Sequence, residues 1–198
     1  MDIDPTAYVD EEAVAEARKS RLNSRVAVSV ALLATFVGIC KVKDDNIVQA
    51  MQQAQADKVD HWSFYQARNI REEIARAELT QVRVQALTAA PAARPLLDSV
   101  AKTYAELAQR EHQKKADVQR QAEDDQKTYD ALNVHDDQFD LSDALLAIAI
   151  SLLALTSLTQ KRWLFWLAML PVVIGVVFGL AGLLGWGLHS DALARALS

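Results

Sequence analysis

The residues with the most chemistry to offer lie in one stretch, Asp57-Lys-Val-Asp-His-Trp-Ser-Phe-Tyr-Gln-Ala-Arg-Asn-Ile-Arg71. Asp57 and His61 are four residues apart, a spacing that lets two helical side chains share a metal ion. Two ligands do not make a site, and no second histidine is nearby in the sequence, so we expect no metal here. The aromatic and arginine side chains of the stretch are more typical of packing or of contact with another protein. They are Trp62, Phe64, Tyr65, Arg68 and Arg71.

Other catalytic patterns are missing from the sequence. The serines lie in no nucleophile motif, no glycine loop could cradle a phosphate, and His112 and His135 are isolated. We therefore expect neither an enzyme nor a cofactor. The acidic residues Asp136, Asp137 and Asp140 are more typical of a solvated face, although a cation vestibule is an alternative.

The charges that surround this stretch are strongly segregated. Val26–Cys40 contains none, and Ala144–Ser198 contains only four. Apolar blocks that exclude charge to this degree are typical of membrane spans. The net charge of −5, with no basic face to offset it, argues against a nucleic-acid partner.

The sequence predicts an all-α protein with three transmembrane helices and a long antiparallel, coiled-coil-like helical hairpin between the first and the second. The expected segments, in chain order, are an N-terminal tail with a short helix (1–25), span one (26–42), the hairpin (43–140), span two (141–159), span three (163–188) and a C-terminal tail (189–198).

The hairpin is predicted from the positions of proline, glycine and turn-forming residues in the sequence. No proline or glycine separates Gly38 from Pro91, which favours one helix from about Leu22 to about Ala90. Pro91–Pro95 is the expected turn, and Asn133–Asp140 is an expected break, with Asp140 or Ser142 capping the next helix. Folding about residue 93 pairs position i with roughly position 186 − i, which brings Arg71 near Asp117 and Lys58 near Asp125 or Thr128.

Each hairpin helix carries an expected seam with spacings of three and four residues. The second seam is polar in its middle, so a two-helix coil built on it would be weak, and neighbouring subunits would supply the missing burial. The first seam comprises Ile47, Met51, Ala54, Val59, Trp62, Tyr65, Ile70, Ile74, Ala77 and Val84. The second comprises Leu97, Val100, Tyr104, Leu107, Glu111, Lys114, Val118, Gln121, Asp125, Thr128 and Leu132.

Small residues line one face of each span, which predicts close helix packing in a bundle or an oligomer. They are Ala27, Ala31, Ala34 and Gly38 in span one, Ala147, Ser151 and Ala154 in span two, and Gly175, Gly179 and Gly182 in span three.

The ends of the spans indicate an orientation. Asp4-Pro5 resembles a helix start, and Arg18, Lys19, Arg21 and Arg25 close the N-terminal segment. Lys161 and Arg162 lie on the same side, so the excess of basic residues predicts a cytoplasmic N-terminus, with the hairpin and the C-terminus periplasmic. The N-terminal basic residues would either attract anionic lipid headgroups or serve only to set this topology.

The motif Asp60-His-Trp-Ser-Phe-Tyr-Gln-Ala-Arg68, about twenty residues beyond the first span, resembles the signature of a bacterial family of uncharacterised membrane proteins, domain of unknown function 4337. The resemblance extends along nearly the whole chain. It implies a multi-pass protein of the bacterial inner membrane, and it brings no activity, cofactor or catalytic residue.

Two functions follow as hypotheses. The first is a non-enzymatic integral membrane protein that forms a homo-oligomer, in which the hairpin is a scaffold or a docking arm. Its partners would be the lipid bilayer, further copies and possible membrane or periplasmic proteins. The alternative is a channel subunit or a transporter-associated adaptor, and ion flux in liposomes would distinguish the two.

Overall fold

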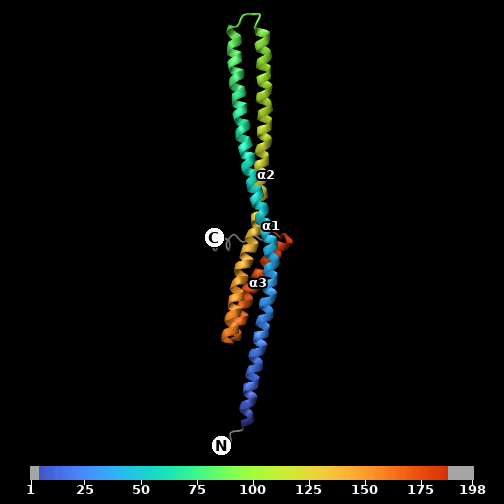
Figure 1. The fold of residues 1–198 in the computed structure, drawn as a ribbon, viewed down its shortest axis with the longest axis vertical. Helices are drawn as coiled ribbons and strands as arrows, with labels where there is room; N and C mark the ends of the chain where they lie inside the picture. The colour runs from blue at the N-terminus through green and yellow to red at the C-terminus, as the bar shows by residue number, and fades with distance from the viewer. Residues whose placement is uncertain (1–4, 187–198) are drawn as a thin grey trace. The chain divides into compact units, whose positions relative to one another are not determined.

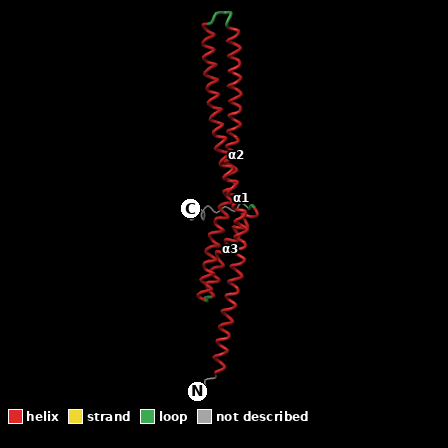
Figure 2. The backbone as a smooth tube through the Cα atoms, viewed as in Figure 1, coloured by secondary structure: helices red, strands yellow, loops and turns green. Residues whose placement is uncertain are grey.

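The computed structural model describes residues 5–186 of the 198-residue chain. It consists of three helices in chain order, α1 (Pro5–Thr88), α2 (Arg94–Thr159) and α3 (Arg162–Leu184) (Figure 1). Residues 5–186 contain no strand (Figure 2). The all-α prediction is confirmed, and each of the three helices contains a stretch long and apolar enough to cross a membrane. These helices are compatible with an integral, multi-pass membrane protein.

The chain divides into two compact units, each built from parts of more than one helix. The membrane unit consists of α1 as far as Gln49, α2 from Leu132 onward, and α3. The hairpin unit consists of α1 from Ala50 onward and α2 as far as Ala131.

Helix α1 begins earlier than the expected start near Leu22. It begins at Pro5, whose missing N–H and fixed φ suit the first position of a helix. The N-terminal segment is therefore not a short helix of its own, because α1 continues through it into the first span. The expected cap, Asp4, lies outside the described residues, as does the C-terminal tail 189–198.

In the hairpin unit, α1 and α2 lie side by side and are joined by residues 89–93 (Figures 1 and 2). The backbone N–H of Ala93 donates to the carbonyl oxygen of Ala90 at 2.9 Å and closes the turn. Helix α2 begins at Arg94, so Pro95 lies in its first turn, where a helix does not need the N–H that proline lacks.

The expected break at Asn133–Asp140 is wrong, because α2 runs through it without interruption. Asparagine and aspartate inside a helix cost only a few tenths of a kcal/mol each relative to good helix formers, and tertiary contacts override such amounts. Gln138 donates its side-chain N–H to the carbonyl oxygen of Trp186 at 2.8 Å, and Phe139 and Leu141 are buried. Asp140 and Ser142 are thus interior helical residues and not caps.

The core of the membrane unit contains residues from all three helices. Val26 and Leu33 of α1, Leu146 and Leu153 of α2, and Ala168 of α3 form one buried cluster. Half-buried apolar side chains, among them Phe36 and Met169, surround it.

The glycines of span three make their close contacts within the chain. Gly175 faces Leu146, Gly179 faces Phe36 and Ser142, and Gly182 faces the ring of Phe139. Because glycine has no Cβ, these side chains reach the backbone of α3.

The small residues of spans one and two that were expected to pack closely do not make such contacts within the chain. Each is exposed, and a Cβ added at Gly38 would have no atom within 4 Å. Their role in packing therefore stays a prediction. The exposed set is Ala27, Ala31, Ala34 and Gly38 in α1 and Ala147, Ser151 and Ala154 in α2.

We expect Gly179→Ala to destabilise the membrane unit. The new Cβ would lie 2.8 Å from two ring atoms of Phe36 and 2.8 Å from Oγ of Ser142, so these groups have to move. Overpacking of this kind costs about 1–3 kcal/mol. Thermal unfolding of the full-length protein in detergent measures the effect. Gly38→Ala is the matched control and should not lower the midpoint, because its new Cβ meets no atom of the same chain and alanine favours a helix more than glycine does. An equal loss in both variants would contradict the assignment.

Candidate functional site

The two sides of α1 in the hairpin unit differ in an unexpected way. The side that packs on α2 carries charged residues, among them Arg68 and the buried Glu72. The side that faces away from α2 carries large apolar residues. The inner side fixes how the two helices pair. The outer side is the candidate interaction surface.

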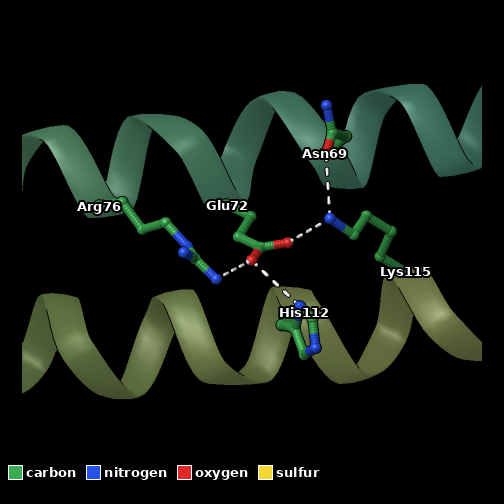
Figure 3. Close-up of polar contacts among 5 residues, drawn as sticks. All are labelled: Asn69, Glu72, Arg76, His112 and Lys115. Atoms are coloured by element: carbon green, nitrogen blue, oxygen red, sulfur yellow. Dashed lines mark hydrogen bonds and ion pairs between the residues drawn. The ribbon is translucent and has the colours of Figure 1, made fainter.

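Glu72 lies at the centre of the inner side (Figure 3). Its residue surface is only 1% exposed, although it carries a carboxylate. Lys115 of α2 approaches Oε2 at 2.7 Å, while Arg76 and His112 approach Oε1 at 2.5 and 3.1 Å. Lys115 also donates to Oδ1 of Asn69 at 3.0 Å.

These cations determine the protonation of Glu72. The hydrogen bond from Lys115 is the strongest influence and, with Arg76 and His112, lowers the pKa of Glu72 to about 2 although burial acts in the opposite direction. Glu72 is therefore ionised at neutral pH. A buried carboxylate of this kind requires its cationic partners at a defined height on the opposite helix.

Further polar contacts join the helices on either side of Glu72. Arg68 donates to both carboxylate oxygens of the buried Glu111, at 2.9 and 3.3 Å, and thereby lowers the pKa of Glu111. Lys58 donates to Gln126, and Nδ1 of His61 lies 2.6 Å from Oδ2 of Asp125.

These contacts lie close to the predicted register. Lys58 was expected near Asp125 or Thr128, and it contacts the residue next to Asp125. Arg71 was expected near Asp117; it is exposed, and Asp117 pairs instead with Arg120 at 3.4 Å. Asp57 and His61 take separate partners, Gln53 and Asp125. No group of three acidic, histidine or cysteine side chains among residues 5–186 is arranged to hold a metal ion.

The aromatic residues of the opening stretch divide between the two sides. Trp62 packs edge-on against Tyr65, with ring centroids 5.3 Å apart. Tyr65 is half-buried, and the Nζ of Lys115 lies 5.9 Å from its ring centroid. Phe64 is exposed and belongs to neither the seam nor this pair.

The apolar stripe expected to form the seam of α1 is only partly in the seam. Met51 and Ala54 are buried against α2, whereas Val59, Ile70 and Ile74 are more than half exposed. The prediction is wrong for these residues because spacings of three and four residues fit more than one face of a helix. The charged partners on α2 pair with the face of α1 that carries Glu72, and not with the face that carries Ile70. The outer face is defined by Val59, Trp62, Ile70, Ile74, Ala77 and Val84.

A second cluster lies in the membrane unit, where α2 brings acidic residues against Asp44 of α1. Asp44 is 4% exposed; its Oδ2 accepts a hydrogen bond from Lys41 at 2.7 Å. Burial, then Asp140 and Asp44, raise the pKa of Asp136 to about 6. Nothing in the sequence marks Asp44 or Glu72 as buried, because isolated acidic residues in a charged segment carry no sign of burial.

A family model described as Domain of unknown function (DUF4337) matches residues 22–185. The chain belongs to this family. The matched range includes the polar seam, the outer face and the acidic cluster of this DUF4337 chain. No similar curated protein and no similar solved structure was found.

We expect Glu72→Ala to destabilise the hairpin by about 3 kcal/mol, because it leaves the half-buried ammonium of Lys115 without its carboxylate. Denaturant unfolding of the full-length protein, followed by circular dichroism, measures the loss. The control is Asp117→Ala, which removes the exposed pair with Arg120 and should cost about 0–1 kcal/mol. Equal effects would show that the Glu72 contacts do not hold the hairpin.

The acidic cluster predicts a dependence on pH. The pKa of Asp136 is raised in the folded state, so folding favours its neutral form. This contribution to stability is fully present below the ordinary aspartate pKa of about 4 and is lost as the pH rises through about 6.

Thermal unfolding between pH 4.5 and 8 tests this dependence. Asp136→Asn should abolish this component and raise the unfolding midpoint at pH 8, whereas Asp98→Asn, at an exposed site, should leave the profile unchanged. An unaltered profile in Asp136→Asn would contradict the assignment.

Proposed function

We propose that this protein is a non-enzymatic integral membrane protein of the bacterial inner membrane that forms a homo-oligomer, with the hairpin as its scaffold or docking arm. The proposed orientation has a cytoplasmic N-terminus and a periplasmic hairpin, following the excess of basic residues at one end of the spans.

The observation that carries the proposal is the outer face of α1. Steps of about 100° per residue place Val59, Ile70, Ala77 and Val84 within about 40° of one another on the helix surface. Glu72 lies on the opposite side. Exposed apolar side chains that gather on one face of a helix beside a polar seam, although Gln66 and Glu73 lie among them, are typical of a protein interface.

A second copy is the occupant that fits both units. In the membrane unit, spans one and two also present exposed small residues, the composition that lets membrane helices of neighbouring subunits approach closely. Self-association can use each of these surfaces. A different partner would need a complementary surface for each of them.

Disulfide crosslinking tests the interface directly. The chain has a single cysteine, Cys40, so a Cys40→Ser background leaves only an introduced thiol. We expect Ile74→Cys in this background to give a crosslinked dimer in native membranes, because Ile74 lies on the outer face. Gln113→Cys, an exposed position on the far side of α2, is the matched control and should stay monomeric.

The same interface predicts the effect of polar substitutions. Ile70→Gln with Ile74→Gln should reduce the particle mass measured by mass photometry while the helix content stays unchanged, and Leu96→Gln should leave the mass unchanged. A monomeric wild-type protein, or equal crosslinking at residues 74 and 113, would overturn the proposal.

A transport role is the second candidate function, and the acidic cluster favours it. Asp44, Asp136 and Asp140 would give one end of the membrane unit a negative potential that attracts cations. Ion flux across liposomes that contain the purified protein distinguishes this role from a scaffold.

A further inference from the structure

Positively charged residues gather where α1 passes the start of α3. A hollow of about 300 Å³ is lined there by four arginines and three apolar side chains. Arg18, Arg21, Leu22 and Arg25 come from α1, and Arg162, Phe165 and Trp166 come from α3. Every residue of the lining belongs to the membrane unit.

The local structure fixes the position of these arginines. Oδ1 of Asn23 accepts hydrogen bonds from Ser157 at 3.2 Å and from Gln160 at 2.9 Å, which ties α1 to the loop between α2 and α3. Leu22, between Arg21 and Asn23, is buried. The turns of α1 that carry Arg21 and Arg25 are therefore held beside the start of α3.

None of the four arginines forms an ion pair with a described residue. The first turn of α3 contains no acidic residue, and the residue before it, Lys161, makes no side-chain cap. The N–H groups and the positive dipole end of α3 thus add to the potential of the arginines.

The surroundings indicate which anion would bind. Arg25 directly precedes span one and Arg162 directly precedes span three, so the hollow lies at the level of lipid headgroups in a membrane. Arginine binds phosphate oxygens through paired N–H groups. The half-buried Phe165 and the exposed Trp166 provide the apolar and aromatic border typical of the interface.

We propose that this hollow binds the phosphate headgroup of an anionic phospholipid. The arginines and the N-terminus of α3 hold the phosphate, while Phe165 and Trp166 contact the glycerol and the adjoining acyl chains. The proposal requires membrane insertion but is independent of the oligomer, so a monomeric protein would leave it standing.

Native mass spectrometry of the full-length protein in neutral detergent tests the site. We expect bound phosphatidylglycerol, at ratios that give no retained phosphatidylcholine. Arg21→Gln with Arg162→Gln should weaken phosphatidylglycerol binding about thirtyfold, given the typical contribution of each arginine near a membrane surface. Replacing the same two residues by lysine should restore part of the binding.

The matched control is Arg83→Gln with Arg94→Gln, which removes the same charge at exposed positions of the hairpin unit. It should bind phosphatidylglycerol as the wild type does, and unfolding midpoints should show that both double variants remain folded. A loss at Arg21→Gln/Arg162→Gln alone supports the site.

Three results would overturn the proposal. Equal retention of phosphatidylcholine would remove the headgroup specificity, and an equal loss in the control variant would reduce the effect to total charge. Displacement of the lipid by millimolar inorganic phosphate would make the hollow a site for free phosphate and not for a lipid.

Discussion

Burying the carboxylate of Glu72 between two long helices requires cations at matching heights, because an unpaired buried charge would be strongly destabilising. Lys115 and His112 supply these cations from α2, and Arg76 supplies one from α1 itself. Sliding α2 by one turn would remove the contacts of Glu72 and those between Arg68 and Glu111. The polar seam therefore helps to fix the register of the hairpin, together with buried apolar residues such as Ala75, Val82 and Ala122.

A polar inner side has a consequence for the outer side. In the hairpin unit, most of the large apolar side chains of α1 are exposed and point away from α2. The hairpin thus combines a specific but weakly apolar seam with an exposed apolar row. Such a distribution suits a helix that pairs with one neighbour through charge and with another through burial.

The membrane unit separates its packing surfaces in a related way. The glycines of α3 pack against Leu146, Phe36 and Phe139 of the same chain, whereas the small residues of spans one and two are exposed. Charge is also separated, with carboxylates around Asp44 and arginines around the start of α3. Both clusters were built from residues far apart in the sequence.

The sequence by itself determined the helical class, the three apolar stretches and the proline turn, because these depend on local composition and on backbone geometry. It also indicated the approximate pairing of the hairpin, which follows from folding a chain about a known turn. Tertiary structure decided the rest. Residues 133–140 stay helical while Gln138 donates to the carbonyl oxygen of Trp186 and Phe139 packs on Gly182 of α3, and propensity alone could not show those contacts. The seam of α1 uses the face of Glu72 and not that of Ile70, because partners for a buried charge come from residues some forty positions away.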